Sequence, residues 1–415
     1  MPTTTEDVSP DRVVDFDIYD PAVTIPVDRM QEHAAALARK APLVYSTAHG
    51  GHWIVTRYDE VHEILRSPDL FSSHPNNLVD AGQGKFIPLE LDPPEHTAYR
   101  FALQPLFNPA RMRALEGQIR DLVNELIDGF AARGEAEFVA EFAHELPTRV
   151  FLALMGWPMA DAPLFTEATE VALNGRPGDT PEQADQSRAE AAMSMFAYFG
   201  KVVAERRGPE GVVGNDVTAE LMRAPVTVDG AERLLTDEEL TRMFFLLLIA
   251  GLHTVQGALA WGVMHLSANP EQRQRLVDDA GAVPDAVEEI LRYEAAVSMG
   301  RRARQDVEIG GVHVKAGDQL LLLLCGANRD ESQFEAPDEL RIDRTPNRHL
   351  AFGSGPHRCI GSHLARIELR IALEELHRRL PDYRLDPANP PLTLPSQVRS
   401  VAKLPIRFTA VPPRP

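Results

Sequence analysis

The longest helical pattern in the chain runs from residue 236 to residue 268 and is apolar on most of its faces. Thr236 and Glu239 have the spacing of a capping box, which marks a helix start, and Asn269-Pro270 ends the pattern. At 1.5 Å per residue this helix would be roughly 50 Å long. A helix that is apolar on most sides has to be buried. We therefore predict that it runs through the middle of the protein.

Charge and cysteine content limit the partners and the compartment. The chain holds 42 lysine and arginine residues against 61 aspartate and glutamate residues, a formal net charge of −19. We expect no nucleic-acid surface and no anionic membrane as partner, because both repel an acidic chain. The only cysteines are Cys325 and Cys359, which argues against a disulfide framework and for a reducing compartment.

The first residues are polar and acidic, without the basic start and the apolar stretch of a secretory signal. The longest uninterrupted apolar run, residues 243–252, is well short of the ~20 residues that span a bilayer. We therefore expect a soluble, cytoplasmic protein without a membrane anchor.

A glycine-rich loop, residues 352–361, precedes the last long helix pattern. Its ten residues include three glycines and a proline, which rule out a regular element. Cys359 lies just before the helix, where free backbone N–H groups and the helix dipole favour thiolate over thiol. Three residues without side chains let a large flat group lie against the backbone, which a lone nucleophile would not need. On these residues alone, Cys359 is either a metal ligand or one more buried cysteine.

The string F-G-x-G-x-H-x-C-x-G in this loop resembles the haem-binding loop of the cytochrome P450 superfamily at every fixed position. The resemblance implies haem b as the cofactor and Cys359 as the axial thiolate of its iron, a ligand that favours O–O cleavage. It also places Phe352 and Gly361 among the residues that hold the haem.

The resemblance covers about residues 28–408. It implies a single domain of the cytochrome P450 fold, mainly α with a small β region. We expect this haem-thiolate domain to span residues 28–415, after a flexible N-terminal arm over residues 1–27.

Four side chains are candidates for binding the haem propionates. Residues 92–100 read D-P-P-E-H-x-x-x-R, with His96 and Arg100 four apart on one helix face. By itself this spacing also suits a solvated polar stripe. In the family the same string begins the helix whose His and Arg bind a propionate, and Arg301 and His357 match two further donors. A guanidinium suits a carboxylate because it offers paired N–H donors.

The centre of the long apolar pattern reads Ala-Gly-Leu-His-Thr at residues 250–254. Gly251 costs about 1 kcal/mol in a helix interior, so its presence beside Ala250 suggests that something flat comes close. Thr254 by itself would bond back to the carbonyl four residues earlier. The family pattern here is A/G-G-x-D/E-T, in which the threonine helps to deliver protons to dioxygen.

His253 takes the place of the family's acidic residue, which is the sharpest departure from the pattern. One hypothesis is that His253 is the proton relay, because an imidazole titrates near pH 6.5 and both accepts and donates protons. A second hypothesis makes it a core histidine without a role in proton delivery. In a third, dioxygen activation is weakened and peroxide substitutes for it.

Glu289 and Arg292 form an i,i+3 pair on a helix pattern that starts near Pro284. Such a pair is worth only ~0.2–0.5 kcal/mol by itself. In the family, E-x-x-R before the haem loop locks the fold behind the cysteine, usually with a later arginine, for which Arg344 is our candidate.

The resemblance also implies a substrate pocket and an electron supply. By position, the pocket candidates are Phe86, Leu247, Ala250, Gly251, Ala296, Val297 and Val398. By analogy, the polar break at residues 174–181 is a mobile lid over the substrate channel. Between residues 341 and 370, six arginines stand against two acidic residues. This segment is either a surface for an acidic electron carrier or an ordinary charged helix surface.

We predict from this resemblance a monooxygenase that inserts one oxygen atom from O2 into a small apolar or aromatic substrate. Electrons would come from NAD(P)H through a ferredoxin reductase and a ferredoxin, and the protein would act as a monomer. The alternatives are a peroxide-using haem-thiolate enzyme and a haem-based sensor or carrier without turnover.

Overall fold

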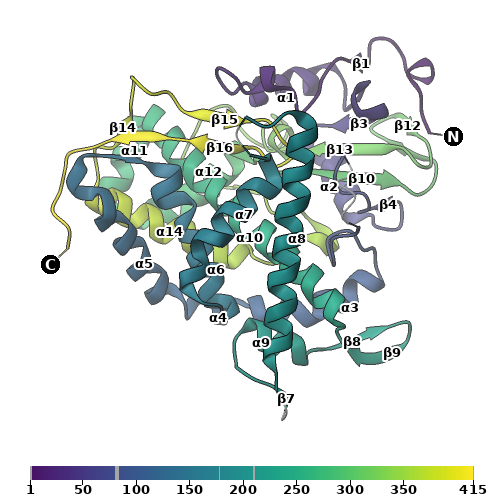
Figure 1. The fold of residues 1–415 in the computed structure, drawn as a ribbon. Coiled ribbons are helices and arrows are strands. Elements are labelled where there is room, and N and C mark those ends of the chain that lie inside the picture. The colour runs from purple at the N-terminus through teal and green to yellow at the C-terminus, as the bar shows by residue number, and fades with distance from the viewer. Residues whose placement is uncertain (1, 80–83, 177, 209–210, 415) are drawn as a thin grey trace.

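Helices make up most of the chain, and the largest sheet lies at one side of it (Figure 1). The computed structural model describes residues 2–79, 84–176, 178–208 and 211–414. The expected mainly α fold with a small β region is confirmed. The helices are α1 (Met30–Lys40), α2 (Tyr58–Arg66), α3 (Glu95–Leu103), α4 (Pro109–Arg113), α5 (Glu116–Phe130), α6 (Glu145–Met155), α7 (Ala162–Asn174), α8 (Pro181–Arg206), α9 (Val217–Arg223), α10 (Asp237–Ala268), α11 (Pro270–Asp278), α12 (Val283–Glu294), α13 (Leu324–Ala327) and α14 (Ser362–Arg379).

Six strands form the largest sheet, in the order β1-β2-β3-β13-β10-β4, with parallel and antiparallel pairs. Its strands are β1 (Val13–Val14), β2 (Leu43–Ser46), β3 (His52–Val55), β4 (Phe71–Ser72), β10 (Ser298–Ala303) and β13 (Gln319–Leu323). Shorter ribbons are formed by β5 (Glu135–Glu137), β6 (Arg207–Gly208), β7 (Gly211–Val212), β8 (Pro225–Val228), β9 (Ala231–Leu234), β11 (Val307–Ile309), β12 (Val312–Val314), β14 (Arg384–Leu385), β15 (Leu392–Leu394), β16 (Ser400–Lys403) and β17 (Pro405–Arg407).

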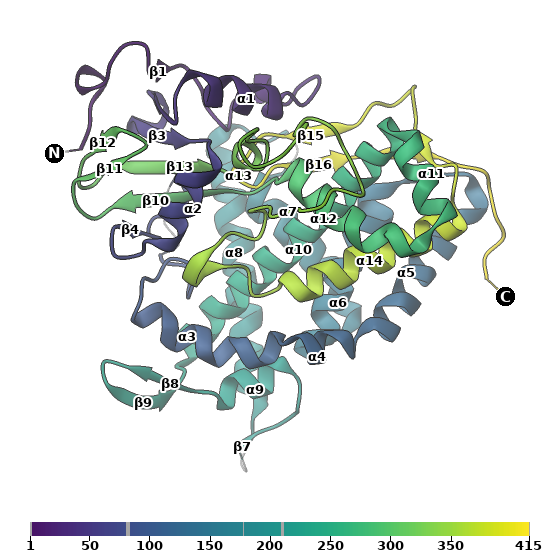
Figure 2. The same ribbon diagram turned by 180° about the vertical axis from the view of Figure 1, so that it is seen from behind.

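α10 runs through the middle of the molecule, with α6, α8, α12 and α14 packed around it (Figure 2). Its start has the predicted capping box: Thr236 N donates to Glu239 Oε2 (2.7 Å) and Glu239 N donates to Thr236 Oγ1 (3.2 Å). Within the described ranges, α10 is the one helix long and apolar enough to cross a membrane. Of its most apolar window, 67% is buried inside the protein, as in the core helix of a folded domain.

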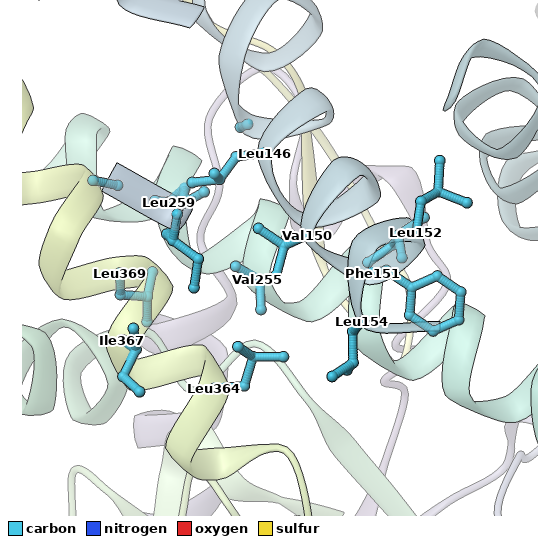
Figure 3. Close-up of a cluster of buried hydrophobic side chains, with 14 of the residues drawn as sticks. Leu146, Val150, Phe151, Leu152, Leu154, Val255, Leu259, Leu364, Ile367 and Leu369 are labelled. Atoms are coloured by element: carbon cyan, nitrogen blue, oxygen red, sulfur yellow. The ribbon is translucent and has the colours of Figure 1, made fainter. Parts of the chain in front are cut away.

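Apolar side chains join α10 to α6 and α14. Figure 3 shows how they lie, with α6 above α10 and α14 alongside. All of them are buried, so the three helices share one continuous core. The residues are Leu146, Val150, Phe151, Leu152 and Leu154 of α6, Val255 and Leu259 of α10, and Leu364, Ile367 and Leu369 of α14.

The segment before α1 packs against the largest sheet. Phe16, Ile18 and Val23 are buried, and β1 pairs with β2. Thr3 donates to the buried Asp318 from both its amide and its hydroxyl (2.6 and 2.7 Å). The predicted boundary at residue 28 therefore has no counterpart in the packing of residues 2–27. Isolated apolar residues in a polar segment have no period, so the sequence did not show that they are buried. The flexibility of this segment stays a prediction.

Candidate functional site

The glycine-rich loop lies between the sheet side and α14, and its backbone makes a short turn over Gly355–His357. Gly353 and Gly355 have positive φ angles of 67° and 69°, which favour glycine. A Cβ at Gly355 would lie 2.4 Å from the Leu65 carbonyl oxygen, so this glycine also allows close contact with α2. The amide of Cys359 donates to the carbonyl of Phe352 (2.9 Å), which closes the loop on itself.

Cys359 retains exposed surface, and the protein around its sulfur nevertheless changes its chemistry. Burial raises the pKa of the Cys359 thiol, whereas the Gly361 backbone and the positive charges of Arg100 and Arg358 lower it. Burial outweighs the N-terminal helix effect that the sequence suggested, so the free sulfur is held as a thiol. A coordinated cation deprotonates a thiol. A thiolate at this position would therefore be favoured by a bound cation.

Two histidines meet near this loop. The rings of His96, on α3, and His357, in the loop, have centroids 4.0 Å apart. Burial lowers the pKa of His96 to about 4, and burial together with the charges of His96 and Arg301 lowers that of His357 to about 2. Nδ1 of His96 and Nε2 of His357 are buried and have no hydrogen-bond partner among the described residues.

Arg301, on β10, adds a buried positive charge to the same group. It is 3% exposed, and its Nη1 donates to the carbonyl of the adjacent Gly300 (2.7 Å). Burial lowers the pKa of Arg301 to about 10. Arg100, four residues after His96, donates to the Arg358 carbonyl in the loop. A buried guanidinium without a paired carboxylate is costly in a protein on its own, so this group of donors fits an anionic ligand.

The centre of α10 presents small residues. Ala250 is exposed in the middle of a buried helix, and Gly251 and Thr254 are half-buried. Thr254 Oγ1 donates to the Ala250 carbonyl (2.8 Å), the ordinary bond of a helical threonine. A Cβ at Gly251 would meet only Phe151, at 3.6 Å, so nothing in the described protein requires glycine there. The close approach of a flat group at Gly251 stays a prediction.

His253 points to α7. It is buried, and its Nε2 lies 3.3 Å from the carbonyl oxygen of Thr169. Burial lowers the pKa of His253, and the nearby Glu170 carboxylate opposes this shift. His144 is close by, with Nε2 3.5 Å from Glu170 Oε2. Among the described contacts, no hydrogen bond joins the side chains of His253 and Thr254. The sequence placed His253 on α10 but contained no signal for its partners on α7.

Glu289, Arg292 and Arg344 come together in one buried cluster. Arg292 makes two bonds to Glu289 (2.7 and 2.8 Å), and Arg344 Nε lies 3.0 Å from Glu289 Oε2. Arg292 also donates to the carbonyls of Asn328 and Pro337, both at 2.9 Å. These bonds tie α12 to the segment that leads into the cysteine loop.

The pocket candidates fall into two groups in the structure. Val297 and Val398 form an isolated β-bridge, and the Ala296 carbonyl accepts from Arg399 N (3.0 Å). Phe86 stacks on Phe245 of α10, with centroids 6.1 Å apart.

The aromatic stack continues from Phe245 to Phe196 of α8, at 4.9 Å. Leu247 is buried on α10. No described contact joins the Phe86 group to Val398, so their meeting around one substrate stays a prediction. Phe245 and Phe196 were missed because an apolar run does not indicate which side chain faces which neighbour.

The arginines between residues 341 and 370 are only in part a free positive surface. Arg344 pairs with Glu289, and Arg366 makes two bonds to Glu288 (2.6 and 2.8 Å). Arg370 pairs with Glu116 (2.7 Å) and Glu374 (3.1 Å). Three of the six charges are thus matched by carboxylates outside the segment or further along α14. The local excess of positive charge is smaller than the sequence suggested.

Comparisons with known proteins agree with this geometry. The family model Cytochrome P450 matches residues 180–407. The chain is 36% identical to the mycinamicin IV hydroxylase/epoxidase of Micromonospora griseorubida over 343 residues, 80% of this chain and 83% of the relative. It is 34% identical to a methyl-branched lipid omega-hydroxylase of Mycobacterium bovis, over 90% of each chain. The crystal structure of cytochrome P450 CYP101C1 has a TM-score of 0.86 with 31% identity, covering 98% of this chain and 100% of the other.

Proposed function

The chain belongs to the cytochrome P450 family, and we propose that Cys359 is the thiolate ligand of its haem iron. The protein is a P450 monooxygenase with haem b as its cofactor. Haem with a thiolate ligand supplies the activation of dioxygen. The observation that carries the proposal is the buried group beside the cysteine loop: Arg301, and the ring nitrogens of His96 and His357 that have no hydrogen-bond partner among the described residues.

These donors would hold the haem propionates. The guanidinium of Arg301 and the ring nitrogens of His96 and His357 have unused hydrogen-bonding capacity, which two carboxylates would satisfy. Arg100 would contribute from α3. Phe352 and Gly361 in the loop would contact one face of the haem. Ala250 and Gly251, whose small side chains leave room beside α10, would contact the other.

We propose that the substrate is apolar or aromatic. The side chains that would line its pocket carry no charge, and the aromatic stack of Phe86, Phe245 and Phe196 supports binding of a flat or apolar molecule. The substrate would meet residues of α10 on one side and of the turn after α12 on the other. The proposed pocket residues are Phe86, Leu247, Ala250, Gly251, Ala296, Val297 and Val398.

Electrons would come from NAD(P)H through a ferredoxin reductase and an acidic ferredoxin, with the protein acting as a cytoplasmic monomer. The exposed Arg348 and Arg358 support a docking surface near the cysteine loop. The pairing of Arg344, Arg366 and Arg370 reduces this support. The lid at residues 174–181 stays a proposal by analogy, and residue 177 lies outside the described residues.

The ligand assignment is tested by replacing Cys359 with serine. We expect the Cys359→Ser protein, reduced under carbon monoxide, to lose the absorption band of thiolate-ligated haem completely, because a hydroxyl does not replace the thiolate. The matched control is Cys325→Ser, since Cys325 is the other cysteine and is buried in α13. A band that survives in Cys359→Ser, or that is missing from the wild type, would contradict the assignment.

We propose that His253 is a proton relay. Its imidazole ring would hold the proton, and its Nε2 is directed to the Thr169 carbonyl. Thr254 would then hold, at its Oγ1, the proton that is delivered to dioxygen. Replacing His253 with aspartate should change the ratio of product formed to NAD(P)H consumed by roughly a factor of two or more, because a titratable group is exchanged for another with a different pKa. His253→Asn is the matched control, since asparagine is polar but does not titrate. Equal ratios in the wild type and both variants would remove the relay hypothesis.

The alternative of a peroxide-using enzyme rests on the same histidine. Turnover with peroxide alone, compared with turnover by ferredoxin, its reductase and NAD(P)H, separates the two. Faster product formation with peroxide would favour the alternative. A protein that binds haem and yields no oxidised product under either regime would instead be a sensor or carrier.

A further inference from the structure

We propose that Glu288, Arg366 and His349 form a clamp that positions Phe352, and through Phe352 the sulfur of Cys359. This inference rests on the proposed role of Cys359 as the iron ligand. None of the three clamp residues belongs to the Glu289 cluster or to the propionate donors.

Glu288 is the centre of the clamp. It lies on α12 and accepts two bonds from Arg366 of α14: Nε to Oε1 at 2.6 Å and Nη2 to Oε2 at 2.8 Å. It also lies 3.1 Å from His349 Nε2. Burial works against its charge, yet Arg366 and His349 hold the pKa of Glu288 at about 2. Glu288 is therefore ionised near neutral pH, and a two-bonded guanidinium has a defined plane.

This guanidinium lies over the ring of Phe352. The central carbon of Arg366 is 4.4 Å from the centroid of the Phe352 ring, within the range of a cation–π contact. The ring of His349 lies 5.9 Å from that of Phe352. His349 Nδ1 accepts from the Ala351 amide (3.2 Å), so its Nε2 carries the proton donated to Glu288. One carboxylate thus orients both groups that contact the phenyl ring.

Phe352 is joined directly to the proposed ligand. Its carbonyl accepts from the Cys359 amide (2.9 Å), across the turn of the glycine-rich loop. Any displacement of Phe352 therefore moves the backbone that carries the sulfur.

Groups behind a metal ligand tune the metal by orientation and by charge. The negative Glu288 and the positive Arg366 nearly cancel near Cys359, so removing either one leaves a net charge of known sign. A positive charge near the site favours the reduced iron, and a negative charge favours the oxidised iron. The clamp therefore predicts opposite shifts of the reduction potential for the two substitutions, which a loss of packing would not produce.

The experiment compares the haem reduction potential of the wild type with that of Glu288→Gln and Arg366→Met. We expect Glu288→Gln to shift the ferric–ferrous equilibrium about threefold to tenfold toward ferrous, at most about 59 mV for one electron. Arg366→Met should shift it in the opposite direction. Arg366→Lys keeps the charge but loses the planar contact with Phe352. It should keep the wild-type potential more closely than Arg366→Met and should lower the fraction of thiolate-ligated carbonyl complex.

Glu374→Gln is the matched control. Glu374 lies on α14, like Arg366, and pairs with Arg370 of the same helix (3.1 Å) and with Arg120 of α5 (2.5 Å). None of the described contacts joins it to Phe352. The clamp is overturned by an unchanged potential in folded Glu288→Gln, by equal shifts in Glu288→Gln and Glu374→Gln, or by shifts of the same sign in Glu288→Gln and Arg366→Met. Thermal unfolding of each variant verifies that it is folded. If Arg366→Met does not fold, the reduction potential of Glu288→Gln, compared with the wild type and Glu374→Gln, still tests the clamp. A wild type without the thiolate band would instead refute the proposed role of Cys359.

Discussion

Replacing Glu289 with alanine should lower the free energy of unfolding by about 3–5 kcal/mol, because it would leave two buried guanidinium groups without their counter-charge. The side chains of Glu289 and Arg292 are both 0% exposed, and that of Arg344 is 5% exposed. Glu289 Oε1 also accepts from the Arg341 amide (2.8 Å). The substitution would therefore loosen the segment that enters the cysteine loop as well as α12.

Chemical denaturation of the haem-loaded protein, followed by circular dichroism, measures this loss. The matched control is Asp343→Ala, which breaks the exposed pair between Asp343 and Arg275 (3.0 Å). An exposed pair contributes about 0–1 kcal/mol, so the control should unfold almost as the wild type does. A Glu289→Ala protein no less stable than this control would show that the cluster does not hold the fold.

Replacing Glu368 with glutamine should stabilise the protein by about 2–4 kcal/mol near pH 7.5. Glu368 lies on α14, is 2% exposed, and its Oε2 has no hydrogen-bond partner among the described residues. Burial raises the pKa of Glu368 to about 8. The carboxyl is therefore protonated in the folded protein at neutral pH, whereas the unfolded chain ionises it near its ordinary pKa.

The sign of the pH dependence follows from this difference. Between about pH 4.5 and pH 8 the folded state binds one more proton at Glu368 than the unfolded state, so this group makes stability fall as the pH rises. Glu368→Gln should remove this fall. Unfolding midpoints measured from pH 5 to pH 8 test it, with Glu190→Gln as the control for an exposed carboxylate. Parallel pH profiles in Glu368→Gln and the wild type would contradict the prediction.

Local sequence determined several features that the structure keeps. The capping box of Thr236 and Glu239 starts α10, and Gly353 and Gly355 of the cysteine loop occupy conformations that favour glycine. These features depend on a few neighbouring residues, so their spacing was enough. The E-x-x-R spacing likewise placed Glu289 beside Arg292, although the sequence by itself assigned the pair little energy. The packing of α12 buries both residues, and this burial is what raises the expected free-energy cost of breaking the pair.

Local sequence patterns did not predict the long-range contacts. His253 lies at the expected place on α10, but its ring faces the carbonyl of Thr169, 84 residues away. From the sequence alone, Arg366 would be a charged residue on a helix surface. Only the packing of α14 against α12 pairs it with Glu288. The polar N-terminal segment shows no period, yet Ile18 is buried against the sheet.

The sequence by itself determined the family and the cysteine loop, because these depend on residue type and spacing along the chain. The residues proposed to hold the haem come from the same spacing and stay a prediction. Only the tertiary structure decided which charges are cancelled, which donors lack partners and where the side chain of His253 is directed. Burial and pairing set the pKa values and interaction energies of these groups. Both depend on neighbours that are distant in the sequence and close only after the helices pack.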